Sequence, residues 1–200
     1  MNCLLVVEDA PSEAVLRRLV GLAGHTLNVT TVFRAGGFGQ IKSRIANFRN
    51  ACHVVPHIVM TDLDAYPCPP DLLKDWKIGK LPDRMLVRVA VREVESWLLA
   101  DGEGIAKLIQ VPTVKIPGNP DELPDPKQVL LNLARKSKSR RFASEFVPAT
   151  GSKAKHGPLY NLHLTAFAEK SWDSNRAERA SPSLKRAIHR IKEFARRHQA

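Results

Sequence analysis

The chain has 200 residues, 44% of them hydrophobic and 26% charged, and its formal net charge is +11. This balance is typical of a globular domain with a sizeable core and argues against an intrinsically disordered chain. Cys3, Cys52 and Cys68 are too few for a disulfide framework, so we expect reduced thiols and a cytoplasmic protein. No apolar run is long enough to span a bilayer, and the early one stops at Glu8, so we expect neither a membrane contact nor a secretory signal.

Short apolar runs alternate with helical patterns through the first half of the chain. Residues 4–7 form a continuous apolar run, which is typical of a strand buried on both faces. Strands that alternate with helices indicate βαβ units, so the sequence predicts an α/β fold with a mostly parallel sheet flanked by helices. Strands are predicted over 4–7, 27–33, 57–60 and 85–91, and helices from residue 11 to 22, over 40–50 and over 93–100.

Prolines mark the predicted divisions of the chain. Residues 66–82 contain several prolines and are predicted to form a loop. We divide the chain into an α/β domain (1–110), a proline-rich connection (111–126) and a basic helical extension packed on the domain (127–200). Within the extension, helices are predicted over 126–135, 159–170 and 183–198, with an exposed loop over 148–158.

The positive charge is concentrated in this extension. Residues 1–126 carry 14 Lys and Arg against 15 Asp and Glu, whereas residues 127–200 carry 17 against 5. Such a basic segment indicates a polyanionic partner, DNA or RNA first of all, although a solvated surface gives the same pattern. A phosphate-binding face would lie on the same side as Asp62 and Asp64. The candidate nucleic-acid-binding residues are Lys153, Lys155, Arg190, Arg196 and Arg197.

Acidic pairs follow three of the predicted strands. Because parallel strands end at a common edge where ligands bind, these side chains are expected to converge. Adjacent carboxylates repel unless a cation neutralises them, and oxygen ligands suit hard cations, so the pattern indicates a Mg²⁺ site that also accepts Mn²⁺. The alternative is that the acidic residues only cap helices and keep loops hydrated. The pairs are Glu8 and Asp9, Asp62 and Asp64, and Glu93 and Glu95.

The first acidic pair and the strand ending at Asp62 resemble a phosphoreceiver domain, with Asp62 as phosphoacceptor. That template requires a Ser or Thr after the fourth strand and a Lys-Pro pair after the fifth. Here Arg92 and Glu93 follow the fourth strand, and Lys115 is followed by Ile116. The second half of the template therefore fails.

The segments Val7 to Glu13 and Asp62-Leu63-Asp64 resemble a TOPRIM domain better, although Asp9 stands where that pattern often has Gly. The segment from Val91 to Asp101 is similar to the most recognisable part of a bacterial TOPRIM-like family (domain-of-unknown-function family 4276), which is similar to OLD-type nucleases. Segments 125–127, 157–161 and 181–184 resemble later landmarks of that family. The resemblance implies a nuclease paired with an ATPase in anti-phage defence.

The first functional hypothesis is therefore a Mg²⁺-dependent nuclease that hydrolyses phosphodiesters. On this hypothesis Glu8, Asp62, Asp64 and Glu95 form the catalytic and metal-binding set, with Glu8 as ligand or general base. The resemblance favours Glu95 over Glu93 as the last metal ligand, and Glu93 is kept as the alternative. The second hypothesis is a non-catalytic module that binds nucleic acid or a partner, and the third is a phosphoreceiver-like regulator.

Overall fold

The structure, a computed structural model, describes residues 1–198. Its centre is a four-stranded, entirely parallel sheet with the strand order β2-β1-β3-β4. The predicted α/β fold class is confirmed. The strands are β1 (Asn2–Val7), β2 (Asn28–Arg34), β3 (His57–Asp62) and β4 (Met85–Ala90).

Both faces of the sheet are buried, which explains the continuous apolar runs of its strands. Successive side chains point to opposite faces, so each strand contributes to two separate cores. Leu5 and Ile58 belong to the larger core, whereas Val6 and Val59, their neighbours along the chain, belong to the smaller one. All four side chains are fully buried.

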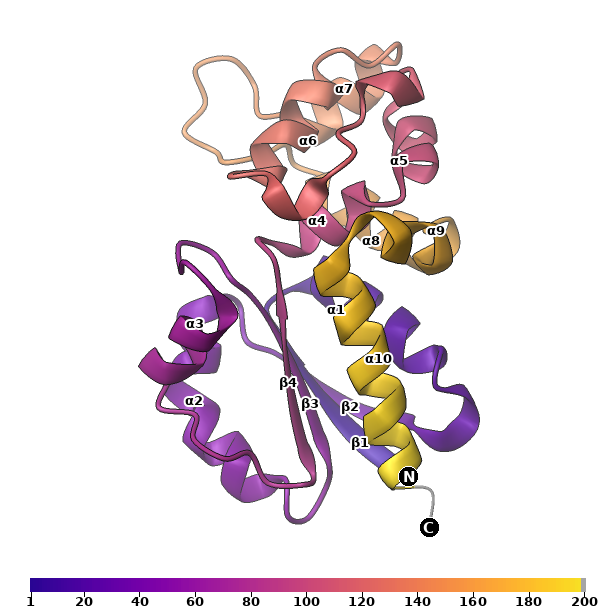
Figure 1. The fold of residues 1–200 in the computed structure, drawn as a ribbon. Helices are drawn as coiled ribbons and strands as arrows, with labels where there is room; N and C mark the ends of the chain where they lie inside the picture. The colour runs from indigo at the N-terminus through magenta and orange to yellow at the C-terminus, as the bar shows by residue number, and fades with distance from the viewer. Residues whose placement is uncertain (199–200) are drawn as a thin grey trace.

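Two helices cover each face of the sheet (Figure 1). One face carries α1 (Ala10–Gly21) and the last helix, α10 (Pro182–Arg197), which packs against the edge strand β4. The other face carries α2 (Phe38–Ala51) and α3 (Pro69–Asp75). The C-terminal helix therefore completes the central α/β layer (Figure 1).

The remaining helices form a second layer above the carboxyl ends of the strands (Figure 1). Its buried centre is α4, where the indole Nε1 of Trp97 donates to Ser183 Oγ at 2.8 Å and Trp172 Nε1 donates to the carbonyl of Trp97 at 3.1 Å. This layer consists of α4 (Val94–Leu99), α5 (Gly102–Ile109), α6 (Pro126–Ala134), α7 (Arg140–Phe146), α8 (Tyr160–Lys170) and α9 (Ser174–Ala180). Short 3-10 helices lie elsewhere in the chain, at Gly24–Thr26, Thr113–Lys115 and Pro120–Glu122.

The predicted strands match the structure within two residues at each end, but part of the predicted loop over 66–82 is wrong. Residues Pro69–Asp75 form α3, with Pro69 and Pro70 in its first turn. Proline fits there because the first helical N–H groups have no partner within the helix. Helices α5, α7 and α9 were not predicted. The division of the chain at 110 and 126 stays a prediction. No helix within residues 1–198 is long and apolar enough to cross a membrane.

Candidate active site

The strand order places a crevice between β1 and β3. From β1 the chain moves outward to β2, whereas from β3 it moves the opposite way to β4. Ligands of open α/β sheets bind outside the carboxyl ends of the strands at such a reversal. Glu8 directly follows β1, and Asp62 is the last residue of β3. The topology thus brings these two predicted site residues to one crevice.

Hydrogen bonds tie Glu8 to the end of β3. One carboxylate oxygen of Glu8, Oε1, accepts from Thr61 Oγ1 at 2.8 Å and from the backbone N–H of Asp62 at 2.9 Å. Asp62 Oδ1 in turn accepts from the backbone N–H of Val94 at 2.9 Å. The second oxygen of each carboxylate has no hydrogen-bond donor among residues 1–198. Each residue therefore keeps one oxygen available to a ligand.

Glu93 and Glu95 join the crevice from the start of α4. Glu95 is 4% exposed, and its Oε1 accepts from the hydroxyl of Tyr160 at 3.0 Å and lies 3.3 Å from Lys127 Nζ. Glu93 Oε2 accepts from the backbone N–H of Lys127 at 3.2 Å. Lys127 thus contacts both glutamates, one through its backbone and one through its ammonium group.

The pKa values show how unfavourable this gathering of charge is. Burial raises the pKa of Asp62 well above its usual range, and the charges of Glu8, Glu95 and Glu93 raise it further. Burial also raises the pKa of Glu8, although the hydrogen bonds to its carboxylate oppose the change. For Glu93, burial and the charge of Glu95 raise the pKa to about 7. Such shifts are common at functional sites and favour a bound cation or proton.

Lys127 provides part of the compensation. Burial alone lowers the pKa of its ammonium group, but the carboxylates of Glu95 and Glu93 outweigh that effect and raise it. Its Nζ also lies 5.9 Å from the ring centroid of Tyr160. Burial and the charge of Glu95 raise the pKa of Tyr160, so its hydroxyl stays protonated and donates to Glu95.

The other two acidic residues lie at the margin of the crevice. Asp64 is exposed, has a positive φ of 52°, and is near enough for its charge to raise the pKa of Glu8. Asp9 caps the N-terminus of α1, where its side chain accepts from the N–H of Ser12 at 2.9 Å. Asp9 therefore has the capping role that the sequence left open, while its charge also raises the pKa of Asp62.

The crevice offers carboxylate oxygens, which are the ligands that hard cations such as Mg²⁺ prefer. As the side chains stand, however, residues 1–198 hold no group of three or more His, Cys, Asp or Glu that could bind a metal ion. The carboxylates are thus near enough to raise one another's pKa values, as predicted, but they do not surround a common point where a metal ion could bind.

The candidate phosphate-binding residues fall in two places. Lys153 and Lys155 are exposed in the loop before α8, and His156 of that loop stacks on Tyr160 with ring centroids 4.7 Å apart. This loop therefore borders the crevice. The candidate arginines of α10 are exposed along a helix that runs from the second layer toward the opposite end of the sheet (Figure 1). The C-terminal end of α10 thus lies away from the crevice, and the single phosphate-binding face stays a prediction.

Sequence reasoning missed Lys127 and Tyr160 as members of the site. Both stand in segments, 125–127 and 157–161, that carried the family resemblance, but no role followed from them. Their contacts with Glu95 span 32 and 65 positions, and no periodic pattern reports such distant pairs. A lysine or tyrosine within a recognisable segment was the only signal.

Comparison of the chain with protein-family models, with curated proteins and with solved structures gives no significant match.

Proposed function

We propose that the protein is a divalent-metal-dependent nuclease that hydrolyses phosphodiester bonds of DNA or RNA at this crevice. The observation that carries the proposal is the meeting of Glu8, Asp62, Glu93 and Glu95 at the switch point of the sheet, where burial and mutual repulsion raise the pKa values of three of them. A cation relieves this repulsion, and Mg²⁺ is the hard cation that phosphoryl chemistry uses most widely.

Each residue has a role in this proposal. Glu8, Asp62, Asp64 and Glu95 would hold a cation, which would polarise a phosphoryl oxygen. Glu93, whose pKa is about 7, accepts the proton of the attacking water, because a base works best when its pKa lies near the working pH. The ammonium group of Lys127 stabilises the negative charge that develops on the phosphate.

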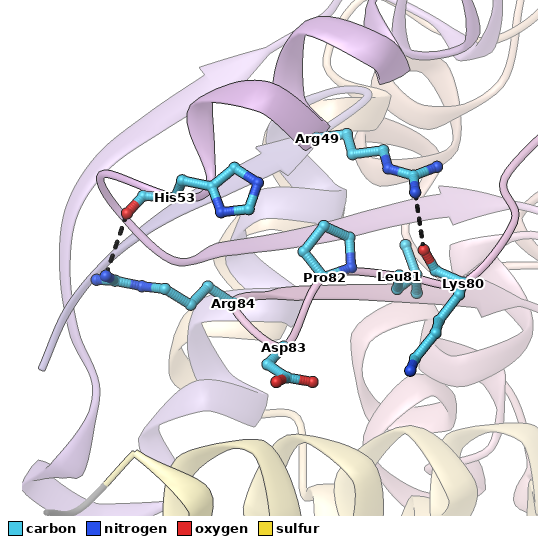
Figure 2. Close-up of a pocket in the computed structure, with 7 residues that line it drawn as sticks. All are labelled: Arg49, His53, Lys80, Leu81, Pro82, Asp83 and Arg84. Atoms are coloured by element: carbon cyan, nitrogen blue, oxygen red, sulfur yellow. Dashed lines mark hydrogen bonds between the residues drawn. The ribbon is translucent and has the colours of Figure 1, made fainter.

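The test is a cleavage assay on plasmid, single-stranded DNA and RNA with Mg²⁺ or Mn²⁺, paired with calorimetric titration of Mn²⁺. We expect Asp62→Asn to lose at least about 100-fold in cleavage and to bind Mn²⁺ more weakly. Asp83→Asn is the matched control, since Asp83 is exposed at the far end of the sheet (Figure 2). Equal cleavage by Asp62→Asn and the wild type would contradict the proposal.

One observation favours the second candidate, a non-catalytic module that binds nucleic acid or a partner such as an ATPase. Lys127 already supplies a positive charge to the crevice, and residues 1–198 hold no ready set of metal ligands. On this reading, Lys127 replaces the cation and the crevice is structural. Metal-dependent cleavage that disappears in Asp62→Asn decides for the nuclease, whereas DNA binding that Asp62→Asn retains, without cleavage by the wild type under any metal, decides for the module.

A further inference from the structure

A second cluster of like charge lies outside the crevice, in the groove between β4 and α10. Glu193, on the same helix, pairs with two of its members, His189 at 3.4 Å and Arg190 at 2.9 Å. A surface hollow of about 630 Å³ opens there, and no acidic residue lines it. Its lining residues are Arg88, Pro182, Lys185, Arg186, His189 and Arg190. The five from α10 recur at intervals of three and four, so they form one side of that helix.

Arg88 is the anomaly in this groove. It lies on the edge strand β4 in register with Met60 of β3, and its guanidinium Nε is buried without a hydrogen-bond partner within residues 1–198. Burial lowers its pKa to about 10, and the charges of Arg190 and Arg186 contribute to the same shift. The residue as a whole is only partly buried, but a partly buried cation among like charges is still unfavourable unless an anion pairs with it.

The arginines at a second pocket, at the amino end of β4, hold loops in place through hydrogen bonds to backbone carbonyls. At the amino end of β4, Arg49 donates to the carbonyl of Lys80 at 3.1 Å, and Arg84 donates to the carbonyl of His53 at 3.1 Å (Figure 2). Arg84 also donates to the carbonyl of Val54 at 3.3 Å. These guanidinium groups join the loop before β4 to the end of α2. Nε of Arg84 lacks a partner as Nε of Arg88 does, but the terminal nitrogens of Arg84 bond to carbonyls, whereas no hydrogen bond within residues 1–198 holds the guanidinium of Arg88.

The groove also continues along the helix. Arg190, Glu193, Arg196 and Arg197 line a further hollow, and Glu193 pairs with Arg190 at 2.9 Å. With 16 residues, α10 is about 24 Å long, over which one strand of duplex DNA presents about seven phosphates. The repeated cations therefore match an extended polyanion better than a single small anion.

We propose that the groove between β4 and α10 binds the phosphate backbone of a nucleic acid, with the partly buried guanidinium of Arg88 as its anchor. Arginine suits this role because its planar fork binds two phosphate oxygens at once and remains charged at every physiological pH. Arg186 and Lys185 add exposed charge beside it. The inference concerns binding alone and does not depend on cleavage at the crevice.

The test measures the binding of a fluorescent oligonucleotide by anisotropy at two salt concentrations, without divalent metal. We expect Arg88→Met to weaken binding about tenfold and Arg186→Glu to weaken it at least as much, with a shallower salt dependence in both. Arg140→Met is the matched control, because Arg140 is an exposed arginine of α7 in the second layer. It should bind as the wild type does.

Two results would overturn the inference. The first is unchanged affinity in Arg88→Met and Arg186→Glu relative to Arg140→Met. The second is a groove that responds only to small anions, detected as a rise in the melting temperature of the wild type with inorganic phosphate that Arg88→Met abolishes while oligonucleotide affinity stays unchanged. Because Arg186 is exposed, its variant remains informative if Arg88→Met folds poorly.

Discussion

The crevice and the β4/α10 groove are both clusters of like charge, but they differ in how the protein compensates them. In the crevice, Lys127 lies 3.3 Å from Glu95, and the hydroxyl of Tyr160 donates to the same carboxylate. Carboxylates can also take up protons, as the raised pKa values of Glu8 and Asp62 record. Arg88 has neither a partner among residues 1–198 nor, in practice, a neutral form at physiological pH.

This difference determines what each cluster requires. The crevice can persist without a ligand because internal contacts and bound protons relieve its repulsion in part. In the groove, Glu193 pairs with Arg190 at 2.9 Å, but Arg88 has no such partner within residues 1–198, so only an anion from outside can compensate Arg88. Removal of a cation should therefore have opposite effects on stability at the two sites, and four predictions test how each cluster is compensated, from the largest expected effect to the smallest.

Replacement of Lys127 by Met should lower the free energy of unfolding by about 3 kcal/mol at pH 7.5, because it leaves the buried Glu95 without its cation. Urea denaturation measures the change. Lys115→Met, at an exposed lysine, should alter the stability by less than about 0.5 kcal/mol. If the two variants are equally stable, Lys127 is not the compensating charge of the crevice.

Glu93 should make stability depend on pH. Its pKa is about 7 in the folded protein and near 4.5 in the unfolded chain, so its contribution is fully present below pH 4.5 and is lost as the pH rises through 7. Between pH 5 and 8, we expect the wild type to lose on the order of 2 kcal/mol more than Glu93→Gln, since solvent screens part of the full effect. Denaturation across that range is the measurement. Glu169→Gln, exposed on α8, should follow the wild type.

Tyr160→Phe should lower stability by about 1.5 kcal/mol, because Glu95 then loses a buried hydrogen bond while the ring packing is kept. The other tyrosine of the chain is a natural control. Tyr66 donates to Asp75 at the surface, and Tyr66→Phe should cost less than about 0.5 kcal/mol. Thermal unfolding of both variants measures the difference, and equal losses would contradict the buried role of Tyr160.

Arg88→Met should have the opposite sign and raise the free energy of unfolding by about 1 kcal/mol in a buffer without phosphate. The unbranched methionine fills much of the space of the arginine stem while removing the unpaired charge. Urea denaturation at low salt is the measurement. A destabilised variant would mean that Arg88 has a stabilising role in the free protein, contrary to its lack of partners.

The sequence was sufficient where local pattern and topology act together. Apolar runs on both faces predicted the parallel strands, and the rule that such strands end at one edge predicted that Glu8, Asp62 and Glu93 influence one another. Their closure around a metal could not be predicted, because side-chain geometry at ångström scale decides it. Lys127 and Tyr160 were missed because their contacts with Glu95 join segments that are remote in the chain.

The orientation of the basic helix α10 relative to the crevice could not be predicted from the sequence either. The sequence predicted that the basic extension packs on the domain, and in the structure an apolar stripe of its last helix, with Leu184, Ile188 and Ile191, is buried. The stripe does not tell which end of the helix lies near the crevice. That depends on Ser183, which receives a hydrogen bond from Trp97 and fixes the start of α10 beside α4. Arg196 and Arg197 are consequently at the other end of the sheet (Figure 1).

The wide spacing of the crevice residues along the chain has a kinetic consequence. Glu8, Asp62, Glu95, Lys127 and Tyr160 come from five separate segments, and the contact between Glu95 and Tyr160 closes a loop of 65 positions. Ordering so distant a pair is entropically costly, so the crevice should assemble after the transition state for folding. Substitutions there should then accelerate unfolding and leave the refolding rate nearly constant, which the two arms of a chevron plot would separate.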